Sequence, residues 1–485
     1  MLHRRNRIEL LDQNVKSIAT FAIQAVEVPM SVLERIDAIV YRAVRTAIGI
    51  GPQQGRVCML QAPTRLRGLR VKSMVDIYRE ALICNTYRWL NNNDGRLRAI
   101  LLGRVEDTRV DCGIDQDVDG TIFFDYRIRE IRLYARSDQA DPQPGVQRVS
   151  YNTLRPRLQF DKGRTLVPLI YRACVHYSVR IDSEGDMWIY SKGSWIEVES
   201  VRMLRSHLRT IYIGRMCPRL RELHAWSQWS SEASISSKSY RWLRRDLTRD
   251  PQYQVACQML FNVLPCNSLK VWNRRSTATV VDPQCNLCTS GHRETVKHIL
   301  CSCSHHALAN LRNARHNKIV REICIWLEIA GAKGRFSDLQ VSTHLREMVD
   351  PSVPIPPLNE RPDICFTFVR DGVKEHHIWE ITVPMDNMMH VAIGQKQTKY
   401  AQLLFNLSDI ARTTMHYQVF AFGVMGAIPA NFEKILGSLS PSSKTDWLVD
   451  EIHKALLYYN HALWCTRDQE VRARMADPAV GTGQC

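Results

Sequence analysis

The pattern of apolar and polar positions predicts a helical first part of the chain. Within residues 32–48 apolar side chains recur at every third or fourth position, which is the spacing of one face of a helix. Pro29 and Gly51 lie just outside this segment, where helices commonly begin and end. A second helix is predicted over residues 71–90. The first part of the chain, residues 1–110, is therefore expected to be helical.

The middle of the chain, residues 111–250, has a mixed pattern. An acidic, turn-rich stretch covers residues 107–120, and a polar break with prolines covers residues 138–145, so both are predicted to be loops or linkers. Residues 180–200 alternate apolar and polar side chains around two glycine-containing turns, Glu184-Gly185 and Lys192-Gly193. This alternation predicts short strands joined by turns.

Residues 200–250 are strongly basic, with eleven Arg or Lys against four acidic residues. Basic residues interleaved with aromatic ones are typical of surfaces that follow a nucleic-acid backbone and stack on bases. A helix with a solvated charged face and a tryptophan core explains the same composition equally well. The interleaved aromatic residues are Trp226, Trp229, Tyr240 and Trp242.

The last part of the chain has the pattern of a small α/β domain. A proline-rich segment, residues 351–362, leads into a predicted strand at 364–369, a turn at Asp371-Gly372 and a strand at 376–383 that ends before Pro384. A helix is predicted over about residues 386–407, with Asp386 near its N-cap, followed by a strand from Tyr417. The predicted order is thus β-hairpin, helix, strand.

Composition narrows the classes of function. The chain has 485 residues and a formal net charge of +16, which indicates several domains and a polyanionic partner, most simply nucleic acid. No apolar signal segment opens the sequence and no long apolar run could cross a membrane, so no membrane association is expected. The 15 cysteines are then expected in a reducing compartment, where clustered cysteines are more often metal ligands than disulfides.

A cysteine-rich cluster follows a segment at 260–272 that is predicted to be helix or strand. Cys285, Cys288, His298 and Cys303 have the spacing CxxC-x9-H-x4-C, which suits tetrahedral zinc. Three thiolates and one imidazole leave no open position, so the site is predicted to be structural rather than catalytic. Cys301 competes with Cys303 for the fourth position, and the spacing after the histidine favours Cys303. A helix is predicted to follow at 306–330.

Two acidic residues in the α/β part suggest metal-dependent chemistry. Asp363 lies at the start of the first predicted strand, and Glu380 lies within the second one between Trp379 and Ile381. An acid inside an apolar strand costs free energy unless it is paired or binds a cation, and acids on adjacent strands can converge on one Mg²⁺. Lys396 and Lys399 share one face of the following helix and can present an ammonium group to these acids. The pattern does not decide between the two lysines. A turn-capping Asp363 and a lysine-paired Glu380 are the structural alternative.

These motifs together resemble a known family. The order of a CCHC cluster, Arg361-Pro362-Asp363, the segment WEITVP and then QKQTKY resembles the restriction-like endonuclease of early-branching, site-specific non-LTR retrotransposons, most closely over residues 260–420. Arg315-His316-Asn317 is similar to a short motif of that family. The N-terminal helices resemble, less closely, the thumb that follows a reverse-transcriptase palm. The resemblance implies a PD-(D/E)xK nuclease with catalytic Mg²⁺ at Asp363 and Glu380, target DNA and element RNA as partners, a nuclear location and action as a dimer on DNA.

The sequence departs from the general PD-(D/E)xK pattern in two respects. Thr382 stands where a lysine two residues after the second acid is usual, so the lysine role would pass to Lys396 or Lys399. The sequence contains no Asp-Asp pair of the kind that a polymerase palm supplies, so polymerase activity is not expected of this chain alone. Because it begins in the thumb-like region, we expect a truncated copy or a partial gene model of a longer polyprotein.

The sequence therefore predicts a multidomain α+β protein. The expected activity is nicking of target DNA to prime reverse transcription. One alternative is an inactive, zinc-dependent nucleic-acid-binding remnant, and another is a zinc-stabilised interaction protein from a domesticated element. The predicted parts are a helical thumb-like region at 1–110, a mixed basic linker at 111–250, a zinc knuckle at 251–316, a restriction-like endonuclease domain at 317–470 and a frayed tail at 471–485.

Overall fold

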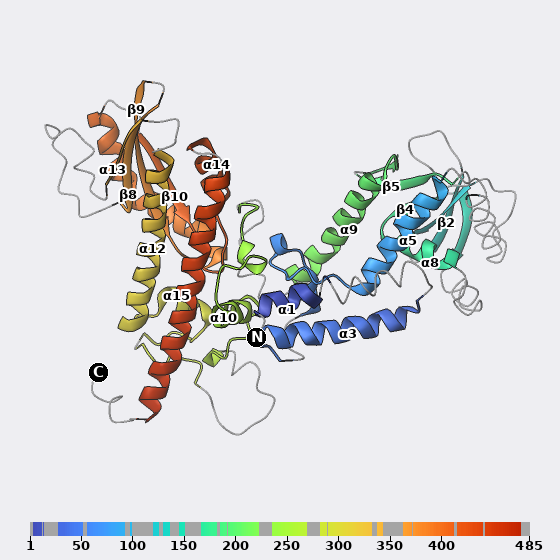
Figure 1. Cartoon of the computed structure of the whole chain (residues 1–485), viewed down its shortest axis with the longest axis horizontal. Helices are drawn as coiled ribbons and strands as arrows, with labels where there is room; N and C mark the ends of the chain where they lie inside the picture. Colours follow the sequence, from blue (N-terminus) through green and yellow to red (C-terminus); the bar gives the residue numbers. More distant parts are fainter. Residues whose placement is uncertain are drawn as a thin grey trace. The chain divides into compact units, whose positions relative to one another are not determined.

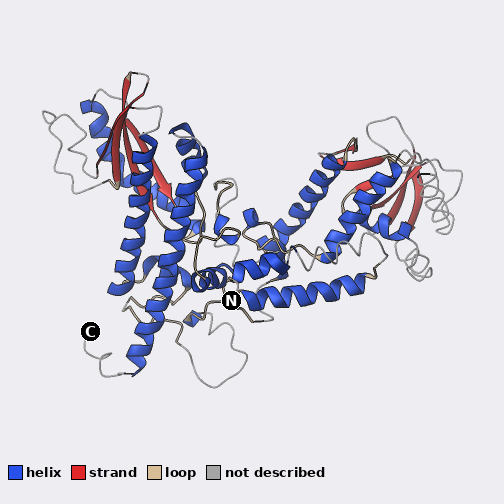
Figure 2. Ribbon diagram, viewed as in Figure 1, coloured by secondary structure: helices blue, strands red, loops and turns tan. Residues whose placement is uncertain are grey.

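The computed structural model is a chain of helices and small sheets, and it confirms the α+β class predicted from the sequence (Figure 2). The structure describes residues 3–11, 13, 28–51, 56–92, 98, 120–125, 130–135, 145–150, 166–181, 185–191, 193–222, 235–268, 282–288, 290–331, 337–342, 362–370, 372–411, 415–439 and 442–476.

The chain divides into two compact units. Unit 1 comprises Met1–Ile8, Val44–Arg70 and Leu220–Cys485, and unit 2 comprises Glu9–Ala43 and Val71–Arg219. Unit 1 thus contains both the cysteine cluster and the predicted nuclease segment. The finer division into five parts stays a prediction.

Unit 2 combines helices with two antiparallel three-stranded sheets. The predicted helices at 32–48 and 71–90 are confirmed as α3 (Met30–Ala47) and α5 (Met74–Leu90), and the hydroxyl of Ser73 caps α5 by accepting from the Val75 amide at 3.1 Å. The strands predicted within 180–200 are also confirmed. The remaining elements are β1 (Gly120–Asp125), β2 (Glu130–Ala135), β3 (Gly145–Ser150), α8 (Leu166–His176), β4 (Val179–Ile181), β5 (Met187–Ser191), β6 (Ser194–Glu197) and α9 (Val201–Arg221).

Unit 1 is built around a four-stranded sheet in the order β10-β9-β8-β7. Strands β7, β8 and β9 are antiparallel, whereas β10 runs parallel to β9 because helix α13 crosses over between them. The strands are β7 (Ser337–Ser342), β8 (Ile364–Arg370), β9 (Val373–Thr382) and β10 (Met415–Ala421). The helices and short helical turns are α1 (Arg4–Leu10), α4 (Val57–Gln61), η2 (Thr64–Leu66), η5 (Arg241–Leu243), α10 (Asp250–Leu260), η6 (His298–Ser302), α12 (His306–Gly331), η8 (Asp386–Met388), α13 (Met389–Ala411), α14 (Ala430–Leu439) and α15 (Ser442–Ala476).

The two faces of this sheet carry different residues because side chains alternate along each strand. One face supplies Phe366, Trp379 and Phe420 to a buried core that α12, α14 and α15 complete. Helices α12 and α15 lie side by side (Figure 1). Glu380 directly follows Trp379 in β9, so its side chain lies on the opposite face of the sheet. Lys396 of α13 contacts it there.

The structure corrects several element boundaries. Strand β7 at the sheet edge was not predicted from the sequence. The helix or strand predicted over residues 260–272 does not begin at Leu260, which is instead the last residue of α10. Helix α12 confirms the predicted helix at 306–330 and continues through the predicted 316/317 boundary. Helix α15 extends to Ala476, so residues 471–476 are helical rather than frayed.

Other predictions concern residues that the structure does not describe. They are the acidic stretch up to residue 119, the break at 138–144, the segment from 269 to 272, the proline-rich segment at 351–361, Trp226, Trp229 and the tail from Asp477.

Candidate functional site

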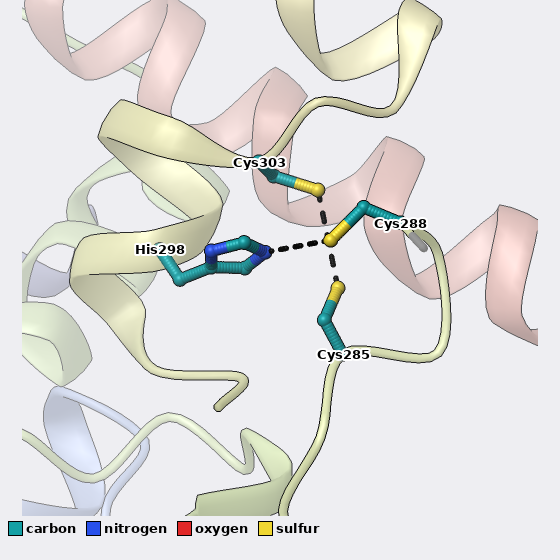
Figure 3. Close-up of side chains that lie close together, drawn as sticks. All are labelled: Cys285, Cys288, His298 and Cys303. Carbon is teal, nitrogen blue, oxygen red and sulfur yellow. Dashed lines mark hydrogen bonds between the residues drawn. The ribbon is translucent and has the colours of Figure 1, made fainter. Parts of the chain in front are cut away.

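The four residues of the predicted zinc ligand set converge in the structure. Their side-chain donor atoms all lie within 4.8 Å of one another (Figure 3). Cys285 Sγ is 3.9 Å from Cys303 Sγ, and Cys288 Sγ is 3.3 Å from His298 Nε2. The set Cys3His can hold a metal ion and is consistent with zinc, which prefers thiolate and imidazole ligands.

Local backbone structure brings these ligands together. A short antiparallel bridge joins Gln284 to Arg293, and the Cys285 amide donates to the His292 carbonyl at 2.9 Å. The η6 turn then carries His298 at its start and places Cys303 immediately after its end, with the Cys303 amide donating to the His298 carbonyl at 2.7 Å. The chain thus presents the CxxC turn and the η6 turn to one point.

Cys301, the competing cysteine, does not join the cluster formed by these ligands. Its thiol is buried, which raises its pKa, and it lies near the guanidinium of Arg315. Within the cluster, the hydrogen bond between the thiols of Cys285 and Cys303 lowers the pKa of Cys285 to about 3 and raises that of Cys303. A thiol that ionises readily is suited to bind a metal ion. The prediction of Cys303 over Cys301 therefore agrees with the geometry.

Helix α15 anchors this segment to the rest of unit 1. Arg474 donates to the carbonyls of Asn286 and Leu287 within the CxxC turn, at 2.6 and 3.1 Å. Arg467 forms a buried ion pair with Glu294, with Nε 3.2 Å from Oε2. The metal cluster is therefore packed into unit 1 through side chains distant in sequence.

The two predicted acids lie beside each other at the open end of the β8–β9 hairpin, opposite its turn. The Asp363 amide donates to Glu380 Oε1 at 3.2 Å, and the Ile381 amide donates to Asp363 Oδ2 at 2.7 Å. Glu380 is fully buried, and its burial together with the charge of Asp363 raises the pKa of the Glu380 carboxyl. Two neighbouring carboxylates of this kind are oxygen ligands that a divalent cation could bridge.

The structure places the two predicted lysines differently. Lys396 Nζ is 2.6 Å from Glu380 Oε2, so it forms an ion pair with the buried acid. Lys399 is exposed, and its ammonium group lies over the ring of Tyr400, 4.8 Å from the centroid. Of the two lysines, the geometry brings Lys396 to the acids.

His316 is a further residue of this site, to which sequence reasoning gave no role beyond a family-like motif. Its Nε2 lies 3.3 Å from Asp363 Oδ2 and 3.1 Å from the Ile381 carbonyl, while Nδ1 lies 3.2 Å from Asn317 Oδ1. Burial disfavours protonation, but the hydrogen bond to Asp363, its negative charge and the contacts with Asn317 and the Ile381 carbonyl together raise the pKa of His316. Burial opposes ionisation of Asp363, but the contact with His316, the hydrogen bond from the Ile381 amide and the charge of Lys396 together hold the pKa of Asp363 below its usual range. Oxygen acceptors near both ring nitrogens favour the cationic imidazole.

Asp386 is not the helix N-cap that the sequence predicted. It lies inside η8, with Met385 in the N-cap position, and it is fully buried. Its carboxylate accepts from the Tyr240 hydroxyl at 2.6 Å and from the Met425 amide at 2.9 Å. A side chain on Gly423 would collide with this carboxylate. Asp386 therefore holds a buried loop together, which explains an acid at this position without a catalytic role.

The basic stretch is divided between two environments. In unit 2, the exposed Arg202, Arg205 and Arg209 follow one face of α9. In unit 1, Tyr240 and Trp242 are buried, so of the two interpretations left open by the sequence the core interpretation fits these residues. Lys238, Arg241 and Arg245 form ion pairs with acids of α14 and α15, which are Glu433, Asp446 and Asp450.

Comparisons with known proteins add no assignment: no family model matches this sequence, and the search of curated proteins finds no similar one. Among the described helices, none combines the length and apolar character needed to cross a bilayer.

Proposed function

We propose that this chain is the C-terminal part of a non-LTR retrotransposon polyprotein and acts as a metal-dependent DNA endonuclease with a structural zinc knuckle. The observation that carries the proposal is the convergence of Asp363, Glu380 and Lys396 at the open end of the β8–β9 hairpin. This hairpin, helix α13 and strand β10 follow one another in the chain, and the hairpin and β10 belong to one sheet. The motif order described above supplies the link to the retrotransposon family.

The donor set suits a catalytic magnesium ion. Asp363 and Glu380 offer carboxylate oxygens, the ligands that Mg²⁺ prefers, and burial together with the repulsion between the two carboxylates raises the pKa of Glu380. A bound Mg²⁺ would supply a Lewis acid that polarises the scissile phosphate. It would also relieve the repulsion between the two carboxylates.

The residues of the chain have separate roles in this proposal. The Ile381 amide and His316 orient the carboxylate of Asp363, while Lys396 holds that of Glu380. When the phosphate approaches, the Lys396 ammonium group orients the attacking water or stabilises the negative charge that develops on phosphorus-bound oxygens. His316 is a positioning residue, since it acts through Asp363.

The Cys3His cluster takes the structural role. Four protein ligands complete the tetrahedral shell of zinc, so no position is left for a substrate. The contacts from Arg467 and Arg474 transmit this local order to α15. We therefore propose that zinc stabilises unit 1, including the core that supports the β8–β9 hairpin with Asp363 and Glu380.

The two lysines provide a matched test of the nuclease proposal. Wild-type protein should nick supercoiled plasmid DNA in the presence of Mg²⁺. Lys396→Ala should lower the nicking rate by roughly a hundredfold or more, because it removes the ammonium group nearest the acids. Lys399→Ala should stay within about threefold of wild type, since Lys399 faces solvent beside Tyr400.

The dependence of nicking on pH separates an electrostatic role of Lys396 from damage to the fold. Lys396 lowers the pKa of Glu380, so its removal raises that pKa further and moves the acid limb of the pH–rate profile to higher pH. Lys399→Ala should leave this limb in place. Equal loss in the two variants, or no nicking by folded wild-type protein with any divalent cation, would contradict the proposal.

One observation favours the second candidate, an inactive nucleic-acid-binding remnant. The ammonium group of Lys396 pairs with the buried Glu380 without any need for a metal ion. In that case Mg²⁺ would neither bind at the acids nor support nicking, whereas nucleic-acid binding would persist.

Both candidates predict salt-sensitive binding of nucleic acid. The arginine row of α9 should contact phosphates, so the affinity for duplex DNA or RNA should fall steeply as salt rises. Replacing Arg202, Arg205 and Arg209 by alanine should weaken binding and reduce the slope of log affinity against log salt by about 3. Arg245→Ala, which removes a cation already paired with Asp450, is the control and should change the slope by less than about 1. An unchanged slope in the triple variant would exclude the row as the binding surface.

A further inference from the structure

A second group of metal-binding side chains lies at the opposite end of β9 from Glu380. Glu375 and His377 are two residues apart in this strand, and therefore project from the same face. His416, in β10, lies directly across the parallel ladder from His377. One carboxylate and two imidazoles thus share one patch of the sheet.

The donor atoms of this group converge. His377 Nε2 lies 3.1 Å from Glu375 Oε2, and His416 Nε2 lies 3.9 Å from the same oxygen. All three donor atoms lie within 4.8 Å of one another. Ligands of one tetrahedral ion are about 3.3 Å apart, because each lies about 2.0 Å from the metal. A small rotation of the exposed His416 side chain would close the set.

The surrounding residues hold the central ligand in place. The ring of His377 stacks against both Phe366 and Phe368 of the neighbouring strand β8, with centroid distances of 4.8 and 5.0 Å. It also stacks on His416 at 4.7 Å. Both phenylalanines are fully buried, so the imidazole that approaches the metal position is fixed by packing.

The chemistry of the group favours a metal over a simple ion pair. A hydrogen bond explains the short contact of His377 with Glu375, but 3.9 Å is too long for one from His416. Two stacked imidazoles repel each other when both are protonated. As neutral ligands, both can donate a lone pair to one divalent cation whose charge Glu375 partly balances.

Access to the group is also suitable. The side chains of Glu375 and His377 are 18% and 10% exposed, whereas that of His416 is 41% exposed. A metal ion could therefore enter from solvent, bind three protein ligands and keep an open position for water, an arrangement found in zinc sites that have three protein ligands.

We propose that Glu375, His377 and His416 form a second zinc-type metal site, separate from the Cys3His cluster and from the acid pair. His377 and Glu380 are an odd number of positions apart in β9, so the two sites lie on opposite faces of the sheet. The proposal does not depend on the nuclease activity. Bound metal would tie β10 to β9 where β10 begins.

Metal stoichiometry of the full chain tests this site. Wild-type protein dialysed against Zn²⁺ and then against metal-free buffer should retain about two equivalents. One is bound at the Cys3His cluster and the other at Glu375, His377 and His416. His416→Ala should retain about one, because the remaining Glu375 and His377 hold the ion roughly a hundredfold more weakly. His390→Ala, which changes an exposed histidine of α13, should retain both.

Cobalt distinguishes the two sites by their ligands. Co²⁺ bound to Cys3His gives thiolate charge-transfer absorption, whereas Co²⁺ bound to Glu375, His377 and His416 gives only ligand-field bands. His416→Ala should lose the part of the ligand-field absorption that the second site contributes and keep the thiolate charge-transfer absorption. Glu375→Gln, which preserves the shape of the side chain, should weaken the second site at least about tenfold. A single equivalent in saturated wild type, or a second equivalent retained by His416→Ala, would overturn the proposal.

Discussion

Replacing Asp363 by alanine is expected to abolish Mg²⁺-dependent nicking of plasmid DNA while leaving DNA binding nearly intact. Asp363 contributes one of the two carboxylates proposed to hold the catalytic metal, and its amide supports the other through Glu380 Oε1. Only the side chain is removed, so the amide contact can persist. The nicking rate should fall by more than roughly a thousandfold, since metal binding and charge stabilisation are lost together.

The loss of activity in Asp363→Ala should be confined to the cleavage step and should not affect DNA binding. Binding rests on distributed arginines and lysines, so the dissociation constant for DNA should change by less than about threefold. The rate is measured by conversion of supercoiled to open-circular plasmid, and binding by titration of labelled duplex without Mg²⁺. Asp246→Ala, which removes a largely exposed acid of the same unit, is the matched control and should nick normally.

Two outcomes and one additional variant test the proposed role of Asp363 and of the neighbouring lysine. Normal nicking by Asp363→Ala would exclude Asp363 as a metal ligand. Loss of nicking in Asp246→Ala as well would indicate general damage to unit 1. A third test restores the usual lysine position: Thr382→Lys in the Lys396→Ala background is expected to recover part of the activity, because Thr382 lies two residues after Glu380 on the same strand face.

The arrangement of the acids could be predicted because it depends on local pattern. Gly372, which adopts a φ of +79°, permits the tight turn of the β8–β9 hairpin, and Pro384 follows the end of β9. Alternation along the strands then fixes which side chains share a face. These signals lie within a few residues of the elements that they define.

The choice between Lys396 and Lys399 could not be predicted because both lie on the same helix face. What separates them is how closely each part of α13 approaches β9, and helix packing against a sheet sets that distance. The burial of Asp386 was hidden for a similar reason. Its hydroxyl donor, Tyr240, comes from a segment 146 residues away in sequence.

The basic stretch shows the limit of composition as evidence. Charge and aromatic content alone could not separate the exposed arginines of α9 from the buried Trp242, whose indole donates to the Met425 carbonyl at 3.1 Å. Tertiary packing buries the second part of the stretch and supplies acids to pair with its cations. The same composition therefore occurs in two different structural environments, one in each unit.

Replacing Cys303 by serine is expected to remove the structural zinc and to destabilise unit 1 strongly. Structural zinc contributes on the order of 10 kcal/mol to the folding of small zinc domains at neutral pH, so loss of one thiolate ligand should remove much of that contribution. The cysteine cluster bonds to α15 through Arg467 and Arg474, and disorder should therefore spread from residues 282–303 into the end of that helix.

Cys301→Ser is the matched control for this prediction. It makes the same chemical change two residues earlier, at a thiol outside the cluster. It should keep one zinc per chain at the Cys3His cluster and lose only about 1 kcal/mol or less of stability. Cys288→Ser should behave like Cys303→Ser, because both remove a ligand of the same ion.

Zinc content and hydrogen exchange measured on the same samples decide the outcome. Cys303→Ser should lack the tightly bound zinc and should exchange its amides rapidly over residues 282–303, whereas Cys301→Ser should match wild type in both measurements. Any zinc retained at the second site is distinguished by its loss in the His416→Ala background. If Cys301→Ser loses the tight zinc and Cys303→Ser keeps it, the ligand assignment is wrong. If both variants keep full zinc occupancy and normal protection, Cys303 is not required as a ligand, and the proposed link between this thiolate and the stability of unit 1 fails.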